Sequence, residues 1–169
     1  LEHLSIARDG TDDVGLFAHV GDGGTLSDLF LAHADIAGGS RVGILAGGNA
    51  GSIQTCRVDG VVSGTDDVGG LVGAISSNGA IEASCSAADV SGANRLGGLA
   101  GSNTGGTVGN AYSTGSVRGE DVLGGLVGHN DGGAVSNSYS SGNVTALGIG
   151  AATTGGLVAS NDNGGTVEN

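Results

Sequence analysis

The sequence predicts an all-β fold, a parallel β-solenoid of about six coils with three short strands in each coil and a period of about 27–28 residues. One observation behind this prediction is a four-residue word, glycine followed by two apolar residues and glycine, that recurs along the chain at nearly constant spacing. The second is composition: 38 of 169 residues are glycine, Pro and Trp are absent, and there are only two Phe and two Tyr. The third is that the apolar segments are short and interrupted by glycine, which weakens helices.

The repeated word marks the first apolar segment of every coil. It is clearest at residues 70–73, 98–101 and 125–128 and weaker elsewhere. The central residues of its six copies are Leu16, Ile44, Leu71, Leu99, Leu126 and Leu157. A second apolar site follows nine or ten residues later, at Leu26, Ile53, Ile81, Val108, Val135 and Val167. A third lies nine or ten residues further on, at Ile36, Val62, Val90, Val117 and Val144. Each site is expected to be a strand that pairs in parallel with its copy in the next coil.

The chain is expected to form one solenoid domain over residues 1–169. At about 4.8 Å per coil, six coils make a rod about 29 Å long. Right-handed coiling is expected from the general preference of parallel crossovers. The coils are placed at residues 1–13 (partial), 14–41, 42–67, 68–95, 96–122, 123–153 and 154–169 (partial).

Two sets of asparagines recur at the coil spacing. Asn103, Asn130 and Asn161 each lie four residues after the central leucine of their own word. A second set, two residues after the second apolar site, comprises Asn110, Asn137 and Asn169. Stacked asparagines can hydrogen-bond from coil to coil, so both sets are predicted to form ladders. The alternative is that Asn stands at these positions because it tolerates turn dihedrals.

Charged residues follow a double period. Asp13, Asp67 and Asp121 recur at equal intervals of two coils, and Arg41 and Arg95 are separated by the same interval. Along the rod the order would be Asp, Arg, Asp, Arg, Asp, with opposite charges on neighbouring coils. We expect an edge of surface ion pairs, each worth about 0–1 kcal/mol.

The repeated word resembles the GLUG repeat, which is named for glycine, leucine, an apolar residue and glycine. Residues 105–117 are also similar to that family, whereas residues 14–67 carry degenerate copies. The resemblance implies a repeat of large surface and secreted proteins of prokaryotes, including adhesin-like and filamentous-haemagglutinin-like chains. It implies no catalytic residue, because the motif consists of structural glycines and core aliphatics.

Composition narrows the classes of partner. The net charge is −12, with 17 acidic residues against five basic ones, so nucleic acid is excluded as a partner. The most apolar run, residues 146–160, is uncharged but too short for a membrane span. The chain begins with Leu1 and no signal sequence precedes the repeats, so a mature or excised chain is expected.

Several candidate sites have a simpler structural explanation. The acids Asp12, Asp13, Asp66, Asp67, Glu120 and Asp121 suggest a carbohydrate-active or carbohydrate-binding edge. The neighbouring arginines would keep these acids ionised, and side chains that stack on sugars are scarce, so no enzyme is expected. Calcium is the one cofactor considered, at Asp22, Asp131 and Asp162 before glycine-rich turns, although turn formation alone explains these residues. An ice-binding solenoid has less weight because no regular threonine array is present.

The cysteines, the histidines and one asparagine are further candidates for chemistry or modification. Cys56 and Cys85 lie three and four residues after their second-site isoleucines, so two free thiols are predicted. The four histidines lack the spacing of metal ligands. A single sequon at residues 143–145, Asn-Val-Thr, is a glycosylation acceptor if the chain is secreted.

The ends suggest how the chain is continued. Leu4 and Ile6 lie in a segment like a third strand, whereas Val167 lies in one like a second strand, and neither end resembles a cap. The prediction is a non-catalytic extracellular structural or adhesive solenoid. Its partners are further copies stacked head to tail in a filament, or flanking parts of a larger surface protein, with surface glycans as a further candidate.

Overall fold

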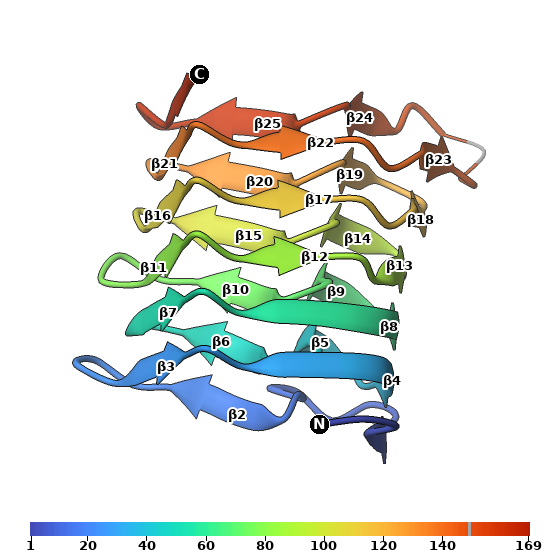
Figure 1. Cartoon of the computed structure of the whole chain (residues 1–169). Helices are drawn as coiled ribbons and strands as arrows, with labels where there is room; N and C mark the ends of the chain where they lie inside the picture. The colour runs from blue at the N-terminus through green and yellow to red at the C-terminus, as the bar shows by residue number, and fades with distance from the viewer. Residues whose placement is uncertain (149) are drawn as a thin grey trace.

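In the computed structural model, which describes residues 1–148 and 150–169, the chain is an all-β solenoid of about six coils. The coils stack from the N-terminus at the bottom of Figure 1 to the C-terminus at the top. No helix occurs among the described residues, and none of them therefore forms a helix that could span a membrane. The predicted fold class is confirmed.

Each coil passes through four parallel sheets. The first sheet contains β5 (Ser40–Gly43), β9 (Asp66–Gly69), β14 (Asn94–Gly97), β19 (Val122–Gly124) and β24 (Thr153–Gly155). The second contains β2 (Phe17–Val20), β6 (Ala46–Asn49), β10 (Val72–Ile75), β15 (Ala100–Thr104), β20 (Val127–Asp131) and β25 (Val158–Asp162). The third contains β3 (Thr25–Ser27), β7 (Ser52–Gln54), β11 (Ala80–Glu82), β16 (Thr107–Gly109), β21 (Ala134–Ser136) and β26 (Thr166–Glu168).

The fourth sheet closes the coil. Its strands are β1 (Ser5–Ala7), β4 (Phe30–Ala37), β8 (Arg57–Ser63), β12 (Cys85–Ser86), β13 (Asp89–Ser91), β17 (Tyr112–Ser113), β18 (Val117–Gly119), β22 (Tyr139–Ser140) and β23 (Val144–Ala146). In the lower coils one long strand, β4 or β8, crosses this sheet. In the upper coils the same path is divided between two short strands, such as β12 and β13, which both pair with β8.

The repeated word forms a corner, which corrects the expectation of three strands per coil. Leu71 is fully buried between β9 of the first sheet and β10 of the second, so the word joins two strands. In this coil glycine is required at position 70, because a Cβ there would lie 2.1 Å from Ser86 Oγ and 2.3 Å from the carbonyl oxygen of Gly98. The next coil therefore approaches the backbone closely at this corner.

One assignment within the repeat is wrong by a residue. Val72 pairs with Ala46, so the partner of Leu71 is Leu45 and not Ile44. The sequence Gly43-Ile44-Leu45 places two large residues where the other coils have glycine and leucine, and the two alternatives are equivalent in the sequence. Ile44 occupies the place of Gly70 and is itself fully buried.

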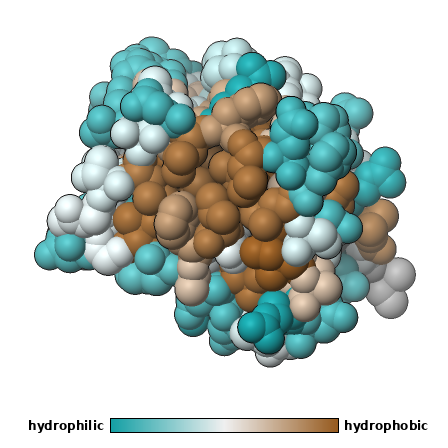
Figure 2. All heavy atoms as spheres, turned by 60° about the horizontal axis from the view of Figure 1, so that its bottom comes forward, coloured by the Kyte–Doolittle hydropathy of each residue, from teal (hydrophilic) through white to brown (hydrophobic). Residues whose placement is uncertain are grey.

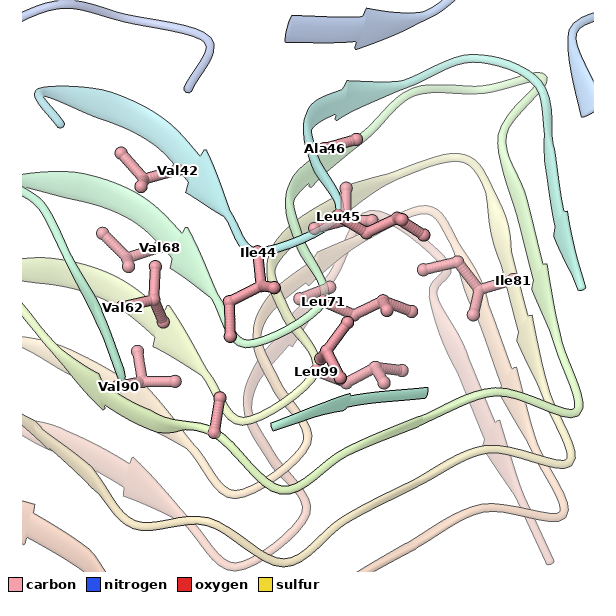
Figure 3. Close-up of a cluster of buried hydrophobic side chains, with 14 of the residues drawn as sticks. Val42, Ile44, Leu45, Ala46, Val62, Val68, Leu71, Ile81, Val90 and Leu99 are labelled. Atoms are coloured by element: carbon pink, nitrogen blue, oxygen red, sulfur yellow. The ribbon is translucent and has the colours of Figure 1, made fainter. Parts of the chain in front are cut away.

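The core consists of aliphatic columns that run along the rod. Figure 3 shows Leu45, Leu71 and Leu99 stacked at the word corner. The second-site residues from Leu26 to Val167 pair in register through the third sheet. The third-site residues from Ile36 to Val144 do the same through the fourth sheet. Each fully buried aliphatic side chain contributes about 1.5–3 kcal/mol, and the core of the described residues contains no aromatic side chain.

Candidate functional site

One edge of the rod carries stacked ion pairs at the start of the first sheet. Asp13, Arg41, Asp67 and Arg95 all have left-handed backbone conformations, with φ of 57°, 54°, 50° and 47°. Arg41 Nε lies 2.6 Å from Asp13 Oδ1, and its Nη2 lies 2.7 Å from Asp13 Oδ2. Arg95 Nε lies 2.7 Å from Asp67 Oδ1, while its Nη2 contacts Asp66 Oδ2 at 2.7 Å. Each arginine therefore binds acids of the preceding coil: Arg41 binds Asp13, and Arg95 binds both Asp66 and Asp67.

Asp121 does not continue this edge, which corrects the predicted order. The equal spacing of the three acids places Asp121 one coil beyond Arg95. Leu96 pairs with Leu123, however, so this coil is one residue longer and the residue beside Arg95 is Val122. The backbone N–H of Asp121 instead donates to the carbonyl oxygen of Ala93 at 3.0 Å.

The acids at this edge differ in their electrostatic surroundings. The hydrogen-bonded guanidinium of Arg41 lowers the pKa of Asp13 below the usual carboxyl value. Burial raises the pKa of Asp66, and the negative charge of Asp67 beside it acts in the same direction. Both Asp66 and Asp67 nevertheless bind the same guanidinium, that of Arg95. These three carboxylates are thus engaged by the arginines of the following coils.

The first asparagine set forms a buried ladder inside the rod. Asn103 Nδ2 donates to Asn130 Oδ1 at 2.9 Å, and Asn130 Nδ2 donates to Asn161 Oδ1 at 2.7 Å. Each amide also donates to a glycine carbonyl in its own turn, as Asn130 does to Gly133 at 2.9 Å. Asn103 and Asn130 are fully buried. The ladder satisfies turn carbonyls that the core would otherwise leave unpaired.

The same column contains a residue that the sequence reasoning missed. Ile75 pairs with Asn49 on one side and Asn103 on the other, so Asn49 belongs to the column but is separated from the ladder by an aliphatic side chain. Asn49 Oδ1 accepts a hydrogen bond from Gly51 N at 3.0 Å. A four-residue offset from Leu45 would have identified it.

The second asparagine set is a column of turns, which corrects the prediction of a second ladder. Asn110 and Asn137 have φ of 49° and 48°, and the equivalent residues of lower coils, Asp28, Thr55 and Ala83, are also left-handed. Asn110 Nδ2 hydrogen-bonds to Glu82 of the preceding coil and not to Asn137. Backbone conformation, and not amide stacking, accounts for asparagine at these two positions.

The three calcium candidates occupy two separate places. Asp22 accepts a hydrogen bond from Asn78 Nδ2 at 3.5 Å in a lower turn. Asp131 and Asp162 are neighbours in the upper coils, where Asp162 accepts a hydrogen bond from Ser160 Oγ at 2.6 Å and contacts His129 Nε2 at 3.1 Å. These contacts lower the pKa of Asp162, the Ser160 bond most of all. Over residues 1–148 and 150–169, no group of three His, Cys, Asp or Glu side chains could hold a metal ion.

The outer face of the fourth sheet carries an aromatic column that sequence reasoning did not identify. Five residues share this column: Phe30, Arg57, Cys85, Tyr112 and Tyr139. The rings of Tyr112 and Tyr139 stack with centroids 5.1 Å apart and an interplanar angle of 3°. Arg57 lies over the Phe30 ring at 5.7 Å. The tyrosine rings cover each other, so their shared faces are not open to sugars. The nearly constant spacing of these five residues in the sequence could have identified the column.

The two cysteines are free thiols, as predicted. Cys85 pairs with Arg57, so Cys56 is offset by one residue from Cys85 in the neighbouring coil. The backbone N–H of Cys56 donates to Ser84 Oγ at 3.0 Å. Burial raises the pKa of the Cys56 thiol. Neither thiol is therefore placed as an exposed nucleophile.

Both ends of the solenoid expose core side chains. Figure 2 shows apolar side chains gathered over the end at the first coil. Leu4, Ile6 and Leu16 pack against the core there but are only partly buried. At the opposite end Val167 is 40% exposed, whereas Val135 in the coil below is 1% exposed. The predicted assembly residues therefore lie on end faces that are not capped by other described residues.

The comparisons with known proteins support the repeat assignment. The family model for the GLUG motif matches residues 92–118 and 121–145, and this confirms GLUG repeats in the chain. Halomucin of Haloquadratum walsbyi (strain DSM 16790 / HBSQ001) is 39% identical over 87 residues, which cover 52% of this chain. The matched region is 1% of the length of halomucin. No solved structure matches the chain.

Proposed function

We propose that the chain is a non-catalytic structural module of an extracellular or cell-surface protein, a rod whose length is set by the number of stacked coils. The observation that carries this proposal is that the recurrent side chains bind one another. The aliphatic columns fill the core, the asparagines cap turns, and the arginines bind acids of neighbouring coils. GLUG repeats and the likeness to halomucin support a surface protein.

The alternatives from other classes have less support. For carbohydrate binding or cleavage, the acids that would serve are bound to Arg41 and Arg95, and Tyr112 and Tyr139 stack on each other. For calcium, the acids that would bind it, Asp22 and Asp162, already contact neighbouring side chains. For ice binding, the outward column of the third sheet is interrupted by alanines at positions 80 and 134. We propose no cofactor.

The open ends suggest what the module binds. The exposed edges of the four sheets carry unpaired backbone groups, and the core side chains beside them remain partly in water. Another coil of the same kind would pair with these groups and bury Leu16 at one end and Val167 at the other. The proposed partner is therefore another β-solenoid coil. It would belong either to flanking parts of a larger surface protein or to a second copy of this chain stacked head to tail.

The proposal is tested by light scattering and electron microscopy of the purified chain at low salt, at high salt and with calcium. We expect end-to-end association that increases with salt, because a net charge of −12 opposes it at low salt. V167D should reduce association by charging one end. V61D is the matched control, because Val61 is 49% exposed on the side of the rod. A monomer in every condition would exclude stacking of copies, and saturable binding or hydrolysis of a polysaccharide would overturn the structural function.

A further inference from the structure

Asn143 and Thr145 are both exposed on the outer face of the fourth sheet. The residue between them, Val144, turns inward and packs against the core. Asn143 precedes β23, whose Val144 pairs with Val117 of β18. The carbonyl oxygen of Asn143 accepts a hydrogen bond from Val117 N at 2.8 Å, which fixes the backbone and leaves the side chain outward. The Asn-Val-Thr triad thus presents both of its polar side chains on one surface.

The amide of Asn143 has a different environment from the other asparagines discussed above. Asn103 and Asn130 are buried in the ladder, and Asn110 binds Glu82. Within the described residues, no hydrogen bond engages the side chain of Asn143 or that of Thr145. The remaining asparagines lack the acceptor pattern, since Asn143 begins the chain's one Asn-x-Ser/Thr triad.

From this geometry we propose that Asn143 is an N-glycosylation site, which rests on the proposed extracellular location. The reaction forms a bond between Asn143 Nδ2 and C1 of the first sugar. The C1–O bond of a lipid-linked phosphate or diphosphate oligosaccharide breaks, its oxygen leaves with the lipid phosphate, and Nδ2 loses a proton. No atom changes oxidation state overall. The glycan would project from the side of the rod and leave both end faces accessible.

The test uses the full chain, directed to secretion in a host that modifies Asn-x-Thr. Each molecule also carries a flexible C-terminal tail with the same triad, and the host is first shown to modify that tail. Peptide mapping by mass spectrometry, before and after treatment with an amidase that removes N-linked glycans, reports occupancy at each site. We expect a glycan at Asn143 in most molecules and its complete loss in N143Q and in T145A, which retains the asparagine.

A matched control moves the acceptor along the same column. D89N in an N143Q background creates a triad with Val90 and Ser91 in a middle coil, where Asp89 Oδ1 accepts a hydrogen bond from Ser116 N at 2.8 Å. We expect lower occupancy there, because β13 lies between β8 and β18 and is flanked by coils on both sides, whereas Asn143 precedes a strand of the last coil of this sheet. A modified tail with an unmodified Asn143 in the unaltered chain would overturn the inference. So would higher occupancy at residue 89 of the double variant than at Asn143 of the unaltered chain. Neither result bears on end stacking, so the proposed function is tested separately.

Discussion

Replacing Asn130 by alanine tests whether the buried ladder stabilises the rod. The Asn130 amide donates to the Gly133 carbonyl at 2.9 Å and to Asn161 Oδ1 at 2.7 Å, and its oxygen accepts from Asn103 Nδ2 at 2.9 Å. Three hydrogen bonds at about 1 kcal/mol each give a loss of about 3 kcal/mol. The partners left without a bond lie in a buried site, which raises the expected loss to about 5 kcal/mol at most.

The loss is measured by urea unfolding followed by far-ultraviolet circular dichroism. With a slope of about 2 kcal/mol per molar urea, N130A should lower the midpoint by about 1.5–2.5 M without changing the slope. N161A removes one ladder bond and the exposed 2.8 Å bond from Asn161 Nδ2 to the Gly165 carbonyl, and it should cost about 1–2 kcal/mol. N78A is the control, because Asn78 is exposed and makes one 3.5 Å bond to Asp22.

A small effect of N130A would contradict a stabilising role of the ladder. If N130A costs less than about 1 kcal/mol, or no more than N78A, the ladder is not a net source of stability. A change in slope would indicate that the coils unfold separately, in which case the loss belongs to a group of coils and not to the whole rod.

Three further predictions concern the corner, the acidic edge and the thiols. G125A should lower the melting temperature by several degrees, because its Cβ would lie 2.1 Å from the carbonyl oxygen of Gly156. G156A is the control and should leave the melting temperature unchanged, because the space around its Cβ is open. Equal melting temperatures of the two variants would refute the argument that close contacts at the corner require glycine. Because Arg41 lowers the pKa of Asp13, this pair stabilises the fold above the ordinary carboxyl value of 3.8 and is lost as pH falls. D13N should therefore flatten the acid limb of a melting-temperature profile, and an unchanged limb would contradict this assignment. Native Cys56 should react with an alkylating reagent far more slowly than in urea, and equal rates would show that the thiol is accessible.

The period of the sequence was sufficient to predict the solenoid and its core. A repeat of about 27–28 residues with aliphatic side chains at fixed offsets can bury them only by stacking equivalent positions. The columns from Leu26 to Val167 and from Ile36 to Val144 follow from that constraint. The buried ladder of Asn103, Asn130 and Asn161 was predictable for the same reason, since its members share one offset from a core leucine.

The exact alignment of neighbouring strands was not predictable where coils differ in length by a single residue. Asp121 misses the ion-pair edge because the coil from Leu96 to Leu123 is one residue longer than the spacing of the charges, and a period over two coils hides such differences. Leu45, and not Ile44, occupies the corner because the parallel pairing of Ala46 with Val72 sets the alignment.

From the sequence alone it follows that the chain coils, which offsets face the core, and that the cysteines are out of line. The three-dimensional arrangement was needed to show that the repeated word is a corner between two sheets, that Asn110 stands in a left-handed turn, and that Tyr112 and Tyr139 stack on the surface. This division arises because burial acts on every equivalent residue of the repeat and is therefore recorded in its period. Left-handed backbone conformations and the directions of surface side chains are instead set locally, by close contacts between one coil and the next.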